Sequence, residues 1–139
     1  MTSAEGPTIM AKLIHSMIRV LDLERSVRFY RQAFGLEESH RLEFPTFKLL
    51  YLRDAQSGCE IELTWNQGHA EPYTHGTGYG HVAFCVDAIA AHREMMLRLG
   101  YAPGDIKSLV APNGSARFYF VTDPDGYKIE VLERAGHYV

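Results

Sequence analysis

Alternating and helical patterns of apolar side chains divide the chain into two similar halves. Strands alternate apolar and polar positions, whereas helices repeat apolar ones every three or four residues. The first half predicts a strand at 13–20, a helix at 23–34, and strands near 37–44, 47–53 and 59–65. The second half predicts a strand at 79–86, a helix at 88–99, and strands near 106–110, 116–121 and 127–132. The order β-α-β-β-β therefore occurs twice, joined by a Gly-, His- and Thr-rich crossing at 66–78.

Residues with known preferences for helix ends flank both predicted helices. Asp22 and Asp87 are candidate N-caps, because a short carboxylate can accept hydrogen bonds from the free N–H groups of a first turn. Gly35 and Gly100 are placed to end the helices, because glycine adopts the left-handed conformation common after a last turn.

Both halves also carry the same pair of polar residues at equivalent places. His15 and His81 each begin the first strand of a half, and Glu62 and Glu130 each lie four residues after a turn glycine. His15 and Glu62 are 47 residues apart, and His81 and Glu130 are 49 apart. Such self-similarity indicates an internal duplication, with one His and one Glu in each copy.

The parity of the strand positions places these four side chains on one kind of face. In the strands that carry them, bulky aliphatic residues occupy alternate positions, where the helix is expected to pack. The His and Glu residues occupy the other positions, and so do Arg19, four residues after His15, and Asn66, four after Glu62. We therefore expect two curved sheets, each with a helix on its back and one His and one Glu in its concavity.

Two imidazoles and two carboxylates that converge in a cleft suit a borderline divalent cation such as Zn, Ni, Co, Fe or Mn. A single His or Glu in mid-strand is usually a surface residue, but four at duplicated positions favour a metal site. Cys85 shares the face of His81, where a small buried residue is the commoner role. The remaining histidines are expected to be solvated: His40, His69, His75, His92 and His137.

Composition fits one compact intracellular domain spanning residues 1–139. The chain has 139 residues, of which 46% are hydrophobic, and a net charge of −3, with no basic run that would suit nucleic acid. Two cysteines are too few for a disulfide framework, which favours a reducing, cytoplasmic location. No apolar run approaches the ~20 residues of a membrane span. Residues 1–11 are expected to form a loose arm, and the last few residues a tail.

Five stretches of the sequence resemble glyoxalase I (lactoylglutathione lyase), a family of the vicinal-oxygen-chelate superfamily. They are residues 13–20, 22–30, 61–66, 78–81 and 123–130, and the resemblance extends from about Lys12 to Glu133. It implies an α+β fold of two tandem βαβββ modules, one at about 12–66 and the other at about 79–134. The two modules would form curved sheets around a metal cleft.

The resemblance also implies a role for each candidate residue. His15, Glu62, His81 and Glu130 would be the metal ligands. Glu130 would be the main catalytic base, and Glu62 would act on the other substrate epimer. Arg19 and Asn66 would hold the glutamyl end of glutathione.

The implied reaction isomerises the hemithioacetal of methylglyoxal and glutathione to S-lactoylglutathione. A carboxylate takes the proton from C1 and returns it to C2 through an enediolate, without a redox cofactor. The apolar or aromatic residues Met17, Phe44 and Tyr119 are candidates to exclude water from the methyl group. The turn at 111–115 lacks the Lys or Arg that often meets the glycyl carboxylate in this family, so Lys107 or Arg117 would have to replace it.

Cofactor and assembly follow from the same resemblance. Compact members with a short crossing tend to use nickel or cobalt, so Ni(II) or Co(II) is favoured over Zn(II), with one ion per site. Because each module supplies only two ligands, a four-ligand site needs two modules face to face. In the family this often happens across a two-fold homodimer.

Three alternatives remain open at the level of sequence. An acyl-CoA epimerase of the superfamily would use similar proton abstraction but usually has Gln at the position of Glu62. A ring-cleaving dioxygenase would need two His and one carboxylate, which leaves Glu62 surplus. A non-catalytic small-molecule-binding relative would normally lack the full ligand set.

Overall fold

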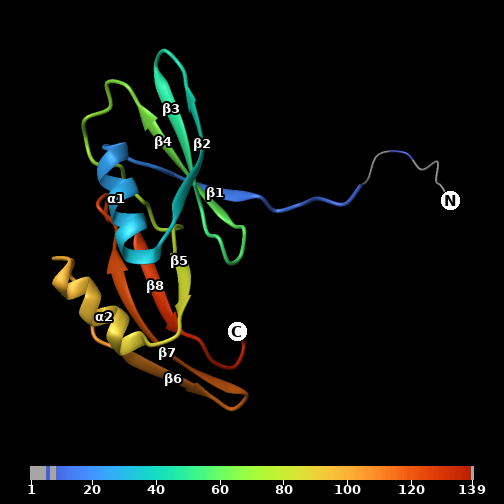
Figure 1. The fold of residues 1–139 in the computed structure, drawn as a ribbon, viewed down its shortest axis with the longest axis vertical. Helices are drawn as coiled ribbons and strands as arrows, with labels where there is room; N and C mark the ends of the chain where they lie inside the picture. The colour runs from blue at the N-terminus through green and yellow to red at the C-terminus, as the bar shows by residue number, and fades with distance from the viewer. Residues whose placement is uncertain (1–5, 7–8, 139) are drawn as a thin grey trace.

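The computed structural model describes residues 6 and 9–138, and it confirms the order β-α-β-β-β in both halves (Figure 1). The first half contains β1 (His15–Arg19), α1 (Leu23–Phe34), β2 (Glu37–Glu43), β3 (Phe47–Arg53) and β4 (Glu60–Asn66). The second contains β5 (Val82–Val86), α2 (Ile89–Arg98), β6 (Lys107–Ala111), β7 (Gly114–Thr122) and β8 (Lys128–Glu133). Most of the expected N-terminal arm, residues 1–5 and 7–8, lies outside the described residues.

Each half forms its own four-stranded open sheet. The strand order is β1-β4-β3-β2 in the first sheet and β5-β8-β7-β6 in the second. In both sheets the first strand of the module runs parallel to the last, and the other neighbours are antiparallel. The first strand of each module, which carries or directly follows its candidate histidine, is therefore an edge strand.

Helix α1 begins and ends as the sequence predicts. The Asp22 carboxylate accepts a hydrogen bond from the backbone N–H of Arg25 at 3.1 Å. Gly35 adopts φ 70°, and its N–H donates to the carbonyl oxygen of Arg31 at 2.9 Å. A residue with a Cβ would be strained at this left-handed φ, so the glycine determines where the helix stops.

Helix α2 corrects the expected N-cap. Its N-cap is Ala88, which offers no side-chain hydrogen bond. The Asp87 carboxylate instead accepts from Nε of Arg134 at 2.6 Å. This pairing arises because the segment after β8 runs beside the end of β5, where the Arg134 N–H also donates to the carbonyl oxygen of Val86 at 2.7 Å.

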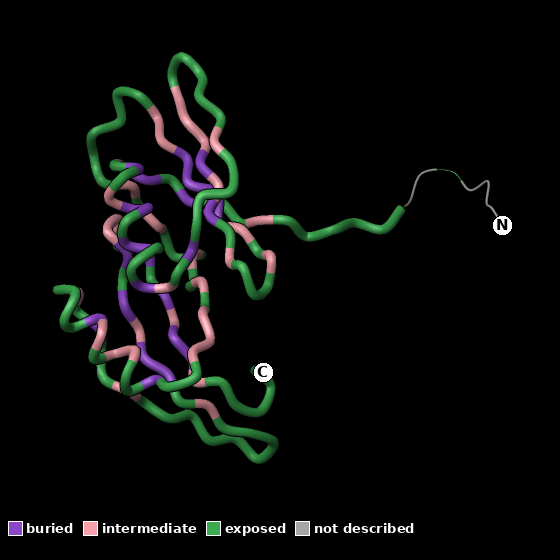
Figure 2. Tube along the Cα trace, viewed as in Figure 1, coloured by how far each residue is buried: buried purple, intermediate pink, exposed green. Residues whose placement is uncertain are grey.

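The hydrophobic core is shared between the modules, because α1 packs on both of them. Figure 2 shows buried positions along α1 and along the strands of both sheets. Phe34 of α1 stacks on Phe84 of β5, with ring centroids 3.9 Å apart. Phe29 of α1 meets Tyr101 of the second module edge to face at 4.9 Å. The expectation of one helix on the back of each sheet is thus incomplete, since α1 also serves the second module.

The C-terminal segment is not the free tail that the sequence suggested. Ala135 and Tyr138 form an isolated antiparallel bridge. The carbonyl oxygen of Tyr138 lies 3.9 Å from Sγ of Cys85. The segment is thus folded back on itself, and the backbone N–H of Arg134 joins its start to the carbonyl oxygen of Val86 in β5 at 2.7 Å.

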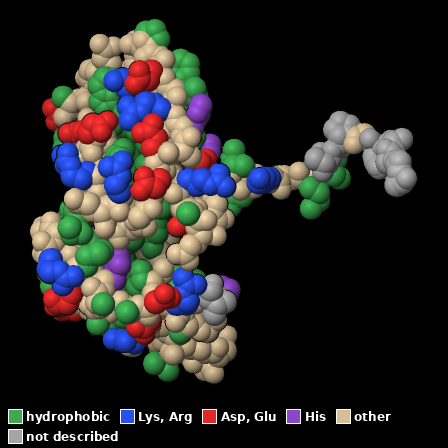
Figure 3. Space-filling model, viewed as in Figure 1, with side chains coloured by type: hydrophobic (Ala, Val, Ile, Leu, Met, Phe, Trp, Pro, Cys, Tyr) green, Lys and Arg blue, Asp and Glu red, His purple; other side chains and the backbone are tan. Residues whose placement is uncertain are grey.

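The molecular surface carries mixed charge. Figure 3 shows Lys and Arg side chains interspersed with Asp and Glu over the face in view. Ion pairs join several oppositely charged side chains of the described residues, including Arg41 with Glu38 at 3.1 Å and Arg117 with Glu133 at 3.2 Å. None of the described helices is both long enough and apolar enough to cross a membrane.

Candidate metal centre

The first His–Glu pair is formed by the parallel strands β1 and β4. Glu62 is the Cα partner of Met17, so His15 lies two residues before that partner and on the same face. Nε2 of His15 is 2.8 Å from Oε1 of Glu62. The Glu62 side chain is 11% exposed and the His15 side chain 26% exposed, so the pair is open to a ligand from one side.

The second pair repeats this geometry in the other sheet. Glu130 of β8 is the Cα partner of Ala83 in β5, and His81 lies two residues before that partner. Nε2 of His81 is 3.2 Å from Oε1 of Glu130. The duplication seen in the sequence is therefore also a duplication of strand register.

An aromatic ring from the neighbouring strand lies beside each pair. Tyr51 is the Cα partner of Glu62, and its ring meets His15 edge to face at 5.4 Å. Phe120 is the Cα partner of Glu130, and its ring meets His81 in the same manner at 5.6 Å. Burial raises the pKa of Tyr51, and the nearby Glu62 and Glu60 carboxylates raise it further. The phenol next to the first pair therefore stays neutral at ordinary pH.

One chain does not bring the two pairs together. Within the part of the chain that the structure describes, no three His, Cys, Asp or Glu side chains are grouped closely enough to hold a metal ion. Each module instead presents one imidazole nitrogen beside one carboxylate oxygen. The donor types fit a borderline divalent cation, and each pair amounts to half of a four-ligand set.

The two residues predicted to bind glutathione end the strands that carry the first pair. Arg19 is the last residue of β1 and is exposed, and Asn66 is the last residue of β4. Nδ2 of Asn66 lies 3.4 Å from the Tyr73 hydroxyl, which comes from the crossing between the modules. Of the cations considered for the glycyl carboxylate, Arg117 is engaged with Glu133 at 3.2 Å, and Lys107 is exposed.

Three side chains differ from their expected surroundings. His92 was expected to be solvated, but its ring contacts the Tyr119 hydroxyl through Nδ1 at 2.5 Å and the Ala33 carbonyl oxygen through Nε2 at 2.7 Å. Tyr119 is fully buried at this contact, so it is not exposed where a substrate methyl group could meet it. His75 stacks on Tyr127 at 4.1 Å, and its Nε2 is buried. All three corrections arise from packing between elements that are distant in sequence.

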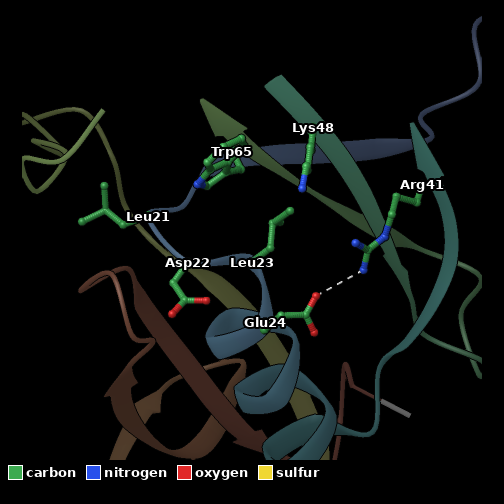
Figure 4. A pocket seen from close by; sticks show the side chains of 7 residues that line it. All are labelled: Leu21, Asp22, Leu23, Glu24, Arg41, Lys48 and Trp65. Atoms are coloured by element: carbon green, nitrogen blue, oxygen red, sulfur yellow. Dashed lines mark hydrogen bonds and ion pairs between the residues drawn. The ribbon is translucent and has the colours of Figure 1, made fainter. Parts of the chain in front are cut away.

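Two cavities lined by described residues lie away from both His–Glu pairs. One cavity of about 340 Å³ lies at the start of α1, between Asp22, Glu24, Arg41, Lys48 and Trp65 (Figure 4). Arg41 crosses it to reach Glu24 at 3.5 Å, and the ammonium of Lys48 lies 5.3 Å from the centre of the Trp65 ring. None of the candidate metal ligands lines this cavity. Its charged lining side chains, such as Arg41 and Glu24, pair with one another.

Comparison with known families assigns this architecture. The model of the glyoxalase/bleomycin resistance protein/dioxygenase superfamily matches residues 12–131. The chain belongs to this superfamily. That match begins just before His15 and includes Glu62, His81 and Glu130.

Among its relatives, this superfamily member is similar to curated bacterial enzymes over nearly their whole length. It is 41% identical to the lactoylglutathione lyase of Haemophilus influenzae over 128 residues, which cover 88% of this chain and 92% of the relative. It is 39% identical to the lactoylglutathione lyase of Salmonella typhimurium, with the same coverage.

Solved structures of the superfamily agree with these matches. The trypanothione-dependent glyoxalase I of Leishmania major superposes with a TM-score of 0.72 at 31% identity, covering 89% of this chain and 87% of that one. Glyoxalase I of Zea mays gives 0.74 at 30% identity, covering 90% of this chain and 45% of the plant chain.

Proposed function

We propose that this protein is a lactoylglutathione lyase. It isomerises the hemithioacetal of methylglyoxal and glutathione to S-lactoylglutathione. The observation that carries the proposal is the pair of equivalent His–Glu contacts, 2.8 Å in the first module and 3.2 Å in the second. They occur in a chain that is 41% identical to a lactoylglutathione lyase.

The two carboxylates move the proton. Glu130 is the main base, which takes the proton from C1 of the hemithioacetal and returns it to C2. Glu62 does the same for the other epimer from the opposite side of the site. Both side chains are mostly screened from water, at 16% and 11% exposure, so bulk solvent competes weakly for the proton.

One divalent ion per site fits the four donors His15, Glu62, His81 and Glu130. When bound, the ion supplies positive charge that stabilises the oxygens on which negative charge develops as the C1 proton leaves. The imidazoles contribute neutral nitrogen ligands and the glutamates contribute oxygen, a set that suits Ni(II) or Co(II) and also admits Zn(II).

Arg19 and Asn66 bind the glutamyl end of glutathione. The Arg19 guanidinium can pair with a carboxylate through two parallel hydrogen bonds, and the Asn66 amide offers both a donor and an acceptor. Both residues lie beyond the first His–Glu pair along their strands, so they would fix the glutamyl end of glutathione while the carboxylates act at C1 and C2, next to the sulfur.

A homodimer supplies the complete site. Within the described residues each chain offers two separate pairs, so a second copy is the simplest source of the missing two ligands. In a two-fold dimer, the first module of one chain faces the second module of its partner, and two identical sites result. An enzyme that acts on a glutathione adduct is expected in the cytoplasm, because glutathione stays reduced there.

Turnover of the named substrate tests the proposal. The purified protein is mixed with methylglyoxal and glutathione, and thioester formation is followed by ultraviolet absorbance. We expect steady turnover that is lost on chelation and returns when a divalent ion is added. If the metal-loaded protein binds the hemithioacetal but forms no thioester, it is a binding protein and not an enzyme.

A further inference from the structure

The turn between β7 and β8 contacts the other module at the end of β1. The hydroxyl of Tyr127 donates to the carbonyl oxygen of Arg19 at 2.8 Å. Oδ1 of Asp125 accepts from the backbone N–H of Leu21 at 3.1 Å, and Oδ2 accepts from the Ser26 hydroxyl at 3.3 Å. Two side chains of the second module thus grip the backbone of residues 19–21, and we name this pair the Asp125–Tyr127 clamp.

Further contacts hold both residues of the clamp in place. Asp123 is 5% exposed and closes the turn by accepting from the backbone N–H groups of Asp125 and Tyr127, both at 2.9 Å. The hydroxyl of Tyr30 on α1 donates to the other Asp123 oxygen at 2.7 Å. The ring of His75 stacks on the Tyr127 ring at 4.1 Å, which fixes the plane of the phenol. The position of the Tyr127 hydroxyl is therefore set before any ligand binds.

The duplicated turn of the first module provides an internal comparison. There Asp54 accepts from the N–H and the hydroxyl of Ser57, and the Cys59 N–H donates to the Ser57 hydroxyl at 3.1 Å. Ser57 and Cys59 stand where the second module has Asp125 and Tyr127, because each glutamate of the pairs lies four residues after the turn glycine. This turn meets the second module through Gln56, whose Oε1 accepts from the Arg134 guanidinium at 3.3 Å. The residues equivalent to Asp125 and Tyr127 instead bond within the turn, so the duplication alone does not explain the clamp.

The strand that the clamp grips differs from its duplicate in the same way. Arg19 lies four residues after His15, and the equivalent residue four after His81 is Cys85. The carbonyl oxygen of Val86, at the end of β5, is met by the backbone N–H of Arg134 from its own module, and the Arg134 side chain in turn donates to Gln56 in the turn of the first module at 3.3 Å. Strand β1, which carries Arg19, is therefore the strand whose end is bound directly by Asp125 and Tyr127 of the other module.

We propose that Asp125 and Tyr127 are positioning residues for Arg19, an inference that rests on the proposed function. Arg19 is the last residue of an edge strand, so β4 alone would hold its backbone from one side. The clamp holds the backbone from the other side and fixes the direction in which the guanidinium leaves the strand. Pre-set direction lowers the entropy lost when the guanidinium pairs with the glutamyl carboxylate.

Removal of one hydroxyl tests this role. In Tyr127→Phe we expect KM for the glutathione hemithioacetal to rise about five-fold, the effect of losing one hydrogen bond of ordinary strength, with kcat and metal content unchanged. Tyr79→Phe is the matched control, because its hydroxyl donates to the Lys128 carbonyl oxygen at 3.1 Å inside the second module. In an Arg19→Ala background, Tyr127→Phe should leave KM unaltered, because the residue that it positions is gone.

A second measurement does not depend on turnover. Asp125→Asn weakens the bond to the Leu21 N–H, and amide hydrogen exchange at Leu21 should quicken without a matching change in the core of β3. If the wild type has no activity, the proposed function fails, while exchange at Leu21 still tests the clamp.

Two results in an active wild type would overturn the positioning role. The first is an equal KM for Tyr127→Phe and Tyr79→Phe. The second is a rise in KM on Tyr127→Phe that is as large in the Arg19→Ala background as in the wild type.

Discussion

Nε2 of His92, on α2, donates to the carbonyl oxygen of Ala33, near the end of α1, at 2.7 Å. That carbonyl can only accept, so the neutral ring carries its proton on Nε2 and accepts from the Tyr119 hydroxyl through Nδ1. The imidazole of His92, on α2, thereby connects helix α1 of the first module with strand β7 of the second.

The His92 contact should make stability depend on pH. Burial lowers the pKa of His92, whereas in the unfolded chain it returns to about 6.5. Below that value the unfolded state binds a proton that the folded state does not, so the unfolding free energy should fall as pH drops from 7.5 to 5.5. The slope from this residue is at most about 1.4 kcal/mol per pH unit.

Denaturant unfolding at several pH values checks this. His92→Gln should flatten the slope below pH 6.5 relative to the wild type. His40→Gln, at an exposed position on β2, should leave the slope as it is. An identical slope in the wild type and His92→Gln would assign the pH dependence to other groups.

Glu130→Gln should nearly abolish turnover while the chain stays folded. The carboxamide keeps the size of the side chain but cannot take a proton, and a general base contributes ~10²–10⁴-fold. The matched control is Glu133→Gln on the same strand, whose carboxylate pairs with Arg117 and lies away from His81. Steady-state kinetics, far-ultraviolet circular dichroism and metal content are measured on both variants. Wild-type turnover in folded, metal-loaded Glu130→Gln would remove Glu130 from the mechanism.

Two inactive variants should restore activity when they share a dimer. His15→Ala damages the first module, and Glu130→Gln damages the second. In a mixed two-fold dimer both defects fall in one site and the other site is intact, so an equal mixture should recover about a quarter of wild-type activity. Co-expression with two different affinity tags isolates the mixed dimer. No recovery in that species, or full wild-type activity in a proven monomer, would place the site within one chain.

Reconstitution should show a preference among metal ions. We expect chelated protein to regain most activity with nickel, less with cobalt and little with zinc, although the His/Glu donor set binds all three. Nickel and cobalt have stronger geometric preferences than zinc, which has none from its d electrons. Activity and bound metal are measured in the same samples. Full activity with one zinc per site would contradict the prediction.

Alternation and duplication were sufficient to predict both His–Glu pairs. Faces within a strand are fixed by local geometry, so His15 with Glu62 and His81 with Glu130 could be matched from spacing alone. The element order and the ends of α1 were also correct, because their signals are local. The roles of the four residues as ligands stay predictions until metal is measured.

Contacts between residues far apart in the sequence could not be predicted in the same way. Asp87 has the chemistry of an N-cap, but a segment some 47 residues later takes its carboxylate. The sequence predicted a solvated His92 on a helix surface and Tyr119 beside the substrate. Their actual contact depends on α1, whose Ala33 carbonyl oxygen binds the other side of the His92 ring. Asp125 could be recognised as a turn residue, whereas its bond to Leu21, 104 residues earlier, depends on how the two sheets are placed.

Because α1 packs on both sheets, neither half of the chain can be separated from the other without exposing buried surface. Tyr30 and Phe29 are each 1% exposed, and both reach residues encoded in the second half. A fragment ending at the crossing would leave this side of α1 in water and would lose the hydrogen bond of Tyr30 to Asp123. After duplication the halves have thus become mutually dependent, and each copy could be recombined into another protein only with a replacement for the surface that the other provides.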